Sequence, residues 1–318
     1  MERMKIETGI KILAILVFIG MLGALKPVIF NGGSSTAKYF AKQNQLEMVS
    51  EEKVEDYFEA VLFGEGEAKI ENIDALPEEQ RTMEVETIFA IDRWVAIFLL
   101  CTTGLLLTPL LFKAHFHHVL LMNLLWLLTL SLCVSLNGGK KFSDLALAAH
   151  ATRWGLPLVL WWVLHNYHRG KKFTQEFTSP VYILLICSSL TFAVHGWEAF
   201  SLNPPFQDLI YNFGGLIGLD IPTSVNTAIL KTVGCMDLIL AAIIFFVKSP
   251  KIFIWMAFWG LITAFSRPLT LGFDAWPEFT MRIANCGLPL MLFLLHRKTA
   301  ETPVESQELN TNMEMTYE

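Results

Sequence analysis

Long apolar runs are the feature of this sequence that most limits how the chain can fold. Runs of about 20 residues, the length that crosses a bilayer as a helix, lie at residues 10–30, 93–112, 119–136, 144–165, 181–202, 226–247, 252–270 and 279–296. Only 17% of the residues are charged, whereas soluble domains are about a quarter charged. The sequence therefore predicts an all-α, polytopic membrane helix bundle with about eight transmembrane helices, of which the third and seventh are the shortest.

Basic residues predict the orientation, because Lys and Arg collect on the cytoplasmic side of a membrane. They lie before the first run and after the second, fourth, sixth and eighth runs, which are alternate ends: Arg3, Lys5, Lys113, Arg169, Lys171, Lys172, Lys248, Lys251, Arg297 and Lys298. Both termini are thus predicted to be cytoplasmic, in the cell inner (plasma) membrane. The first run also resembles a signal peptide, but its length and the lack of a cleavage site favour an uncleaved anchor.

The runs divide the chain into five segments. These are a first transmembrane helix (1–30), an acidic extracytoplasmic insert (31–90), helices 2–4 (91–170), helices 5–8 (171–298) and a disordered cytoplasmic tail (299–318). Within the insert, Ser50 is predicted to cap a short helix with one apolar face, which packs on the membrane domain or binds a protein partner. Neither soluble segment is basic, so nucleic acid is not an expected partner.

A second short helix is predicted between the fifth and sixth runs. Asn203-Pro204-Pro205 opens this loop and Ile221-Pro222 closes it. Apolar residues recur between these ends at helical spacing. That pattern is typical of an amphipathic helix at the membrane interface, which would cap whatever opens on the extracytoplasmic side.

Two runs contain the same tetrapeptide. His150 precedes Gly155-Leu156-Pro157-Leu158 by five positions, and Arg282 precedes Gly287-Leu288-Pro289-Leu290 by five. Together with similar tryptophan spacing, this indicates two four-helix repeats that insert in the same direction. A chance match in a leucine-rich chain is the alternative. Each proline is predicted to bend its helix.

Ionisable residues inside the runs mark a candidate site, because lipid makes them costly unless they face the bundle interior. In the predicted topology they concentrate in the outer half: His150, Arg153, His195, Glu198, Lys231, Asp237, Arg267 and Arg282. One interpretation is an outward-facing polar pocket that binds an anion or a quinone head group, with histidine and carboxylate moving protons. The other is a set of structural ion pairs, Arg153–Asp237 and Arg282–Glu198.

The sequence does not decide whether the protein is an enzyme. His150, His195 and Glu198 have side chains that suit a first-row metal, but no ligand spacing in the sequence indicates one. His115, His117 and His118, beside Lys113, are interpreted as polar flanking groups, with metal binding as the alternative. The sequence has no phosphate loop, nucleophile elbow or His-Glu-x-x-His motif.

The second half of the chain resembles the DoxX-like integral membrane protein families. The order His195-Gly196-Trp197-Glu198, Pro205-Phe206-Gln207-Asp208 and Gly234-Cys235-Met236-Asp237-Leu238 carries the resemblance, mainly within residues 181–296. In those families a helix ends in a polar turn, a short outer segment follows, and the next helix carries a Gly-x-x-acid step. This sequence has Glu198 and Ala199 where they usually have a lysine.

The resemblance implies a four-helix membrane unit and, from some family members, a link to quinone-coupled sulfur oxidation. The sequence is therefore compatible with three functions. The first is a quinone- or redox-linked membrane subunit, with quinone as its cofactor. The second is a small-anion transporter or permease, and the third is a non-catalytic scaffold that binds a partner through residues 31–90.

Overall fold

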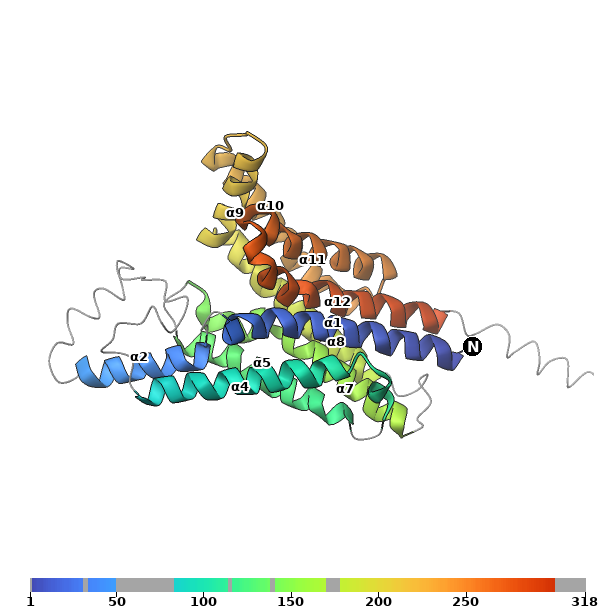
Figure 1. The fold of residues 1–318 in the computed structure, drawn as a ribbon. Coiled ribbons are helices and arrows are strands. Elements are labelled where there is room, and N and C mark those ends of the chain that lie inside the picture. The colour runs from blue at the N-terminus through green and yellow to red at the C-terminus, as the bar shows by residue number, and fades with distance from the viewer. Residues whose placement is uncertain are drawn as a thin grey trace, which may run out of the picture.

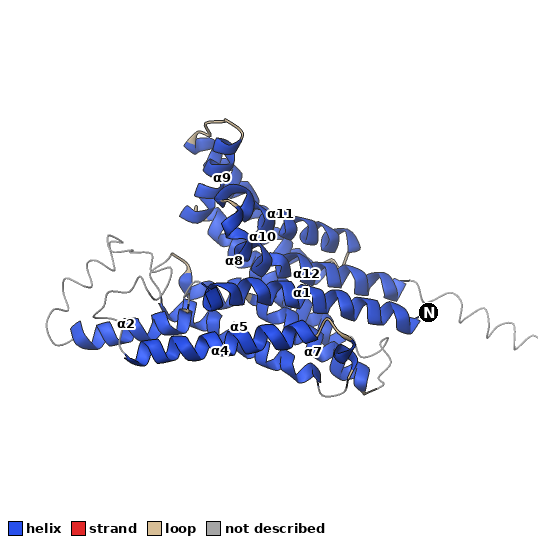
Figure 2. Cartoon of the chain, in the orientation of Figure 1, coloured by secondary structure: helices blue, strands red, loops and turns tan. Residues whose placement is uncertain are grey.

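The chain folds into a bundle of helices. The computed structural model describes residues 2–30, 34–49, 83–113, 116–137, 141–169 and 178–300, which contain helices and no strands (Figures 1 and 2). The long helices are α1 (Glu2–Phe30), α4 (Met83–Leu105), α5 (Val119–Asn137), α7 (Ala151–His168), α8 (Thr178–Phe200), α10 (Thr223–Phe246), α11 (Pro250–Leu271) and α12 (Trp276–Ala300). The shorter ones are α2 (Ser35–Val49), α6 (Ala146–Ala149) and α9 (Pro204–Leu216). The all-α prediction is confirmed.

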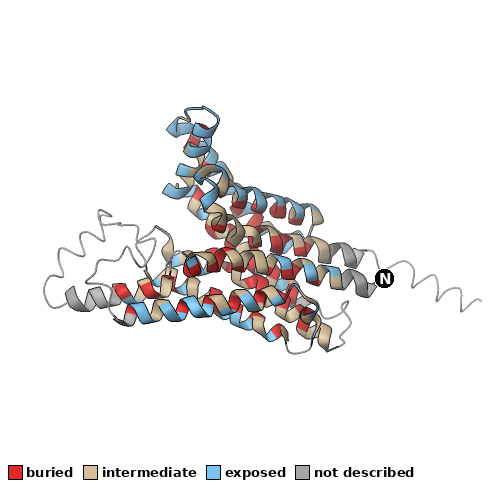
Figure 3. Ribbon diagram, in the orientation of Figure 1, coloured by how far each residue is buried: buried red, intermediate tan, exposed pale blue. Residues whose placement is uncertain are grey.

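Six of the described helices are long and apolar enough to cross a bilayer: α1, α4, α5, α8, α10 and α11. Their surfaces expose large apolar side chains, including Phe246 (85% exposed), Trp94 (72%) and Leu125 (66%). Buried residues lie where helices meet, and exposed residues run along the peripheral faces (Figure 3). Exposed apolar surface on this scale favours aggregation in water and contact with lipid tails in a bilayer. The chain is therefore a multi-pass helical membrane protein.

The helices α7 and α12 lie outside that group of six, although they occupy the middle of the bundle. Their described residues include Arg153 in α7 and Glu278, Arg282 and Asn285 in α12. The helix α12 packs against α1, α7, α8 and α11, and α7 packs against α1, α5, α8 and α12. The sequence instead predicted that the third and seventh runs, the shortest, were the least secure membrane spans. Those runs form α5 and α11, and both helices are long and apolar enough to cross a bilayer.

The helices pack in the same order in the two halves of the chain. In the first half, α1 and α5 each pack on both α4 and α7; in the second, α8 and α11 each pack on both α10 and α12. The halves meet where α1 packs on α12, α8 packs on α7, and α7 packs on α12. The short helices show the same correspondence between the halves. The helix α2 packs on α4 and α5, and α9 packs on α10 and α11.

Glycines bring neighbouring helices into backbone contact, as two pairs of helices show. A Cβ atom added at Gly234 of α10 would lie 2.5 Å from Phe200 N and 2.6 Å from Gly196 O, both in α8. A Cβ atom at Gly260 of α11 would lie 2.5 Å from Asn285 O in α12. Small residues at membrane helix interfaces allow this close approach. The pairs α8–α10 and α11–α12 are therefore tightly fixed.

The helix α4 begins and ends earlier than the apolar run 93–112 predicts. It ends at Leu105, and a turn then leads to a short 3-10 helix at Pro109–Phe112. Its early start buries Asp92, which accepts hydrogen bonds from Ser34 Oγ and Thr36 Oγ1. Ser34 Oγ also accepts a hydrogen bond from Ala37 N at 2.9 Å and caps α2. This contact compensates a carboxylate that the sequence placed outside the span.

The predictions for the soluble segments have different outcomes. The helix predicted between the fifth and sixth runs is present as α9. The helix predicted to begin at Ser50 and the tail after residue 300 lie outside the described residues. The sequence did not anticipate α2, which begins the predicted insert.

Candidate functional site

Six of the seven predicted site residues gather at one end of the bundle, which we call the α9 end. Arg153 lies in the first turn of α7, His195 and Glu198 near the end of α8, and Arg267 near the end of α11. Arg153 interacts electrostatically with Arg282, Glu278, Arg267 and Glu198. We call the following group the arginine cluster: His150, Arg153, His195, Glu198, Arg267, Glu278 and Arg282.

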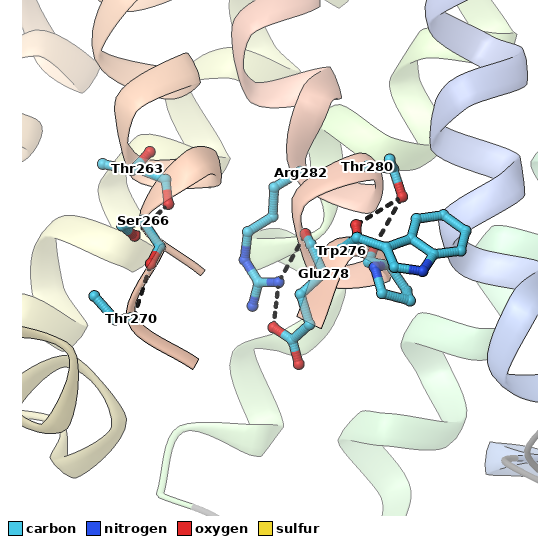
Figure 4. A network of polar contacts seen from close by, with 8 residues as sticks. Thr263, Ser266, Thr270, Trp276, Glu278, Thr280 and Arg282 are labelled. Atoms are coloured by element: carbon cyan, nitrogen blue, oxygen red, sulfur yellow. Dashed lines mark hydrogen bonds and ion pairs between the residues drawn. The ribbon is translucent and has the colours of Figure 1, made fainter. Parts of the chain in front are cut away.

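Glu278 and Arg282 form an ion pair along α12. Arg282 Nη1 donates to Glu278 Oε2 at 2.6 Å and to Glu278 O at 3.1 Å. Figure 4 shows the guanidinium group between α12 and the stretch of α11 that carries Thr263, Ser266 and Thr270. The Glu278 side chain is 44% exposed and the Arg282 side chain 18%. The cluster is therefore open to the surroundings at Glu278.

Glu278 was missed because it stands one residue before the predicted eighth run. Its position four residues before Arg282 was the available signal, since residues at this spacing face each other on a helix.

The first turn of α9 places an aromatic ring between two other helices. His195 Nδ1 lies 3.2 Å from Glu198 Oε2, three residues along α8. The Phe206 ring meets the His195 ring edge-on, with centroids 6.1 Å apart. Arg267 Cζ lies 5.5 Å from the centroid of the same Phe206 ring. Phe206 thus joins α8 to α11, which no pattern in the sequence predicted.

His150 occupies the edge of the cluster nearest α5. Its Nδ1 atom lies 3.2 Å from Ser131 Oγ of α5. It also interacts electrostatically with Arg153, Arg282 and His195. Ser131 and His150 therefore connect the first half of the chain to a site whose other members lie mostly in the second half.

Within the described part of the chain, two guanidinium groups of the cluster have no carboxylate within ion-pair distance. Among the described residues, Arg282 pairs with Glu278, and His195 pairs with Glu198. No ion pair between described residues includes Arg153 or Arg267. Arg267 is only 9% exposed, and its Nε atom has no hydrogen-bond partner. With neutral histidines, three guanidinium groups face two carboxylates. The cluster therefore carries an excess of positive charge in a mostly buried position.

A threonine and asparagine network links three helices next to the cluster. Thr152 Oγ1 of α7 donates to Asn285 Oδ1 of α12 at 2.6 Å, and Thr152 N donates to Thr191 Oγ1 of α8 at 3.1 Å. All three residues are buried. Arg153 follows Thr152 directly and also lines a small, mostly apolar pocket between α1, α5, α7 and α12, with room for about one water molecule. The network fixes the helix that presents Arg153.

Asp237 is the predicted site residue that lies apart from the others. It is 6% exposed, and its Oδ1 atom has no hydrogen-bond partner. A Cβ atom added at Gly196 would lie 3.0 Å from Asp237 Cβ, so the carboxylate stands beside α8. The indole of Trp259 on α11 faces it. Its electrostatic surroundings in the described structure include none of the arginines.

The ion pairs considered from the sequence alone are not the ones that form. Arg282 pairs with Glu278 rather than Glu198, and Glu198 pairs with His195. Arg153 belongs to α7, whereas the helix of Asp237 packs mainly on α8, α9 and α11. Sequence spacing identifies faces within one helix but not the neighbours of that helix, so the partners between helices could not be predicted.

The described part of the chain contains no group of three or more His, Cys, Asp or Glu side chains arranged to hold a metal ion. At the opposite end of the bundle, the ring of His117 lies 4.3 Å from that of His118 and 5.1 Å from that of His168. His165 stands nearby, with its ring centroid 5.7 Å from that of His117. His115 lies outside the described residues. The sequence did not anticipate that the end of α7 adds two histidines to this group.

Three comparisons with known proteins returned no match. No family model matches the chain, no curated protein matches it, and no solved structure matches its fold. The chemistry of the site is therefore the basis for inferring a function.

Proposed function

We propose that this membrane protein binds a small oxyanion in the arginine cluster and moves it across the membrane. The observation that carries the proposal is Arg267, a buried guanidinium group whose Nε makes no hydrogen bond and which has, among the described residues, no carboxylate within ion-pair distance. Arg153 has no ion-pair partner among the described residues either. A buried charge normally has a partner, so an anion supplied from outside is the natural third component.

The geometry favours an oxyanion with several acceptor oxygens. Guanidinium groups present planar forks of donors that match sulfate, phosphate or carboxylate oxygens. Three such groups lie close enough to interact electrostatically. The two carboxylates of the cluster are already engaged, Glu278 by Arg282 and Glu198 by His195. If the charged residues of the cluster served only as structural ion pairs, each guanidinium group would have a carboxylate partner.

The membrane topology completes the proposal. With α7 and α12 counted as spans, eight helices cross the membrane. Lys and Arg then lie mainly on the side of the two termini, which places the termini in the cytoplasm and the α9 end outside an inner (plasma) membrane. Apolar neighbours on several sides of α7 and α12 support this count, because they shield the polar residues of both helices from lipid. The arginine cluster would then open outward.

Two parallel four-helix repeats are part of the same proposal. Exchanging α1, α4, α5 and α7 with α8, α10, α11 and α12 reproduces the packing within each half and also the contacts between the halves. A two-fold axis between α7 and α12 accounts for this pattern. It makes α2 the equivalent of α9, so each repeat would carry one short helix at the same end.

The likeness to DoxX-like families supplies a second candidate, a quinone-linked subunit. Its support is that the quoted motifs meet, since Gly196 packs against both Gly234 and Asp237. The His195 and Phe206 rings would suit a quinone head group. The excess of guanidinium groups favours the anion, because a neutral quinone leaves that charge unpaired. A scaffold function would depend on residues 31–90, most of which lie outside the described structure.

Anion binding can be measured on the full-length protein in lipid nanodiscs. Calorimetric titration with sulfate or phosphate at constant ionic strength should show binding to the wild type. Arg267→Gln should bind at least about tenfold more weakly, since a hydrogen bond to a charged group contributes roughly 1.5–3 kcal/mol.

The control is Lys231→Gln, which changes an exposed cation of α10, and it should bind as the wild type does. Reconstituted liposomes should show flux of the same anion that is lost in Arg267→Gln. A wild type that binds neither anion, together with an Arg267→Gln variant that only loses thermal stability, would support structural charges instead.

A further inference from the structure

Asp237 has surroundings unlike those of the other ionisable residues of the site. It lies in the middle of α10, which is long and apolar enough to span a membrane. The residue is buried, and Oδ1 makes no hydrogen bond. Trp259 faces it from α11, but the Nε1 atom of that indole is also buried without a hydrogen bond. The indole and the carboxylate interact across the helix interface, but the contact is too long or too poorly aligned to satisfy either Oδ1 or Nε1.

No cation of the described residues compensates this carboxylate. The charged or titratable groups on the elements packed around it are Tyr182, Cys187, His195 and Glu198 on α8, Asp208 and Tyr211 on α9, Lys251 and Arg267 on α11, and Lys231 and Cys235 on α10 itself. None of them interacts electrostatically with Asp237 in the described structure. An ionised carboxylate buried without a partner is very costly. A bound proton removes that cost.

We propose that Asp237 is a proton-binding site whose occupancy is coupled to the anion in the arginine cluster. The proton is favoured over a metal cation because the described residues contain no group of three or more His, Cys, Asp or Glu side chains that could hold a metal ion. Trp259, the polar side chain that faces Asp237, is a hydrogen-bond donor and offers no ligand atom. Alkali and alkaline-earth cations require several oxygen ligands. The proton adds to the Asp237 carboxylate and leaves again as H⁺ to water, with no other bond changed.

A direct contact can transmit the effect of that proton. Asp237 Cβ packs on the backbone of α8 at Gly196, which directly follows His195 and lies two residues before Glu198. His195 and Glu198 form the hydrogen-bonded pair that borders Phe206 and Arg267. Ionisation of Asp237 would draw water or a cation toward this turn of α8, and the turn would then shift. The charge on Asp237 and the position of the cluster are therefore linked through one helix turn.

The coupling rests on the proposed anion function, whereas the proton site does not. Infrared spectra of the full-length protein in nanodiscs at neutral pH should contain a protonated-carboxyl C=O stretching band that shifts in D₂O. Asp237→Asn, which keeps the shape of the side chain, should remove that band. Glu198→Gln, which changes a carboxylate engaged by His195, should leave it. Asp237→Glu should restore a band at a different frequency.

The coupling predicts that adding phosphate or sulfate changes the Asp237 band of the wild type. It also predicts that anion flux in liposomes depends on the pH gradient, and that Asp237→Asn abolishes this dependence. A neutral-pH spectrum that Asp237→Asn leaves unchanged would overturn the proton site. An anion that binds without altering the band overturns the coupling. Absence of anion binding to the wild type overturns the proposed function and the coupling together, while the band alone still decides the proton site.

Discussion

The arginine cluster and Asp237 show two ways to keep ionisable groups inside a membrane bundle. In the cluster, five helices or short segments bring three guanidinium groups, two carboxylates and two imidazoles together, and part of the group is exposed. Asp237 has no charged partner among the described residues and is sealed by a glycine contact and an indole. The first arrangement compensates charge with other charges and leaves an excess. The second can avoid charge altogether by binding a proton. In our proposal, this difference separates the anion site from the proton site.

The largest expected effect comes from breaking the α8–α10 contact that seals Asp237. In Gly234→Ala, the added Cβ atom would lie 2.5 Å from Phe200 N, so the helices must separate. Overpacking of this kind costs typically about 1–3 kcal/mol, and more where backbone must move. The free energy of unfolding, measured by denaturant titration in mixed micelles, should fall by that amount.

The matched control is Gly215→Ala in α9, where an added Cβ atom meets nothing within 4 Å. This variant should be as stable as the wild type or slightly more stable, because alanine favours the helix. Equal stability of both variants would mean that the two helices do not approach as closely as the structure shows.

An intermediate effect is expected in the cluster itself. Glu278→Gln removes the carboxylate that competes for Arg282, so anion affinity should rise about two- to fivefold, the size of a partly exposed ion pair. Titration calorimetry with sulfate measures the change. A structural role for the pair predicts the opposite: reduced stability with no gain in affinity.

The smallest effect concerns the network that holds Arg153. Thr152→Val keeps the side-chain shape and removes the hydrogen bond to Asn285 Oδ1. Interhelical hydrogen bonds in membranes contribute on average about 0.6 kcal/mol, so the melting temperature should fall by only a few degrees. Thr232→Val is the control, because its hydroxyl group is exposed and donates to Ala228 O of its own helix. A loss as large as that of Gly234→Ala would show that the network, not the glycines, dominates the packing.

The sequence predicted the class of fold because lipid imposes one requirement on every apolar run. Long runs must be helices that satisfy their own backbone hydrogen bonds, and the described structure contains them. The predicted helix boundaries were wrong where a side-chain contact determines where a helix begins. Asp92 made residues 83–92 look extramembrane, but Ser34 and Thr36 compensate it and α4 extends through that segment.

The sequence also identified most of the residues that gather in the arginine cluster, since an arginine inside an apolar run is costly anywhere but the bundle interior. It grouped Asp237 with the arginines because both lie in the same half of the predicted spans. Their separation depends on which helix faces which, and that is set by contacts such as Gly196 against Gly234. Glu278 and Phe206 were missed for the same reason, as each gains its role only from neighbours on other turns or helices.

The most direct test of the anion site is a structure of the full-length protein with selenate, a heavy analogue of sulfate, determined with anomalous scattering. The account predicts a selenium peak among the guanidinium groups of Arg153, Arg267 and Arg282, and its loss in Arg267→Gln. A map in which the wild type binds selenate only at surface lysines, with those three guanidinium groups paired to protein carboxylates, would contradict it.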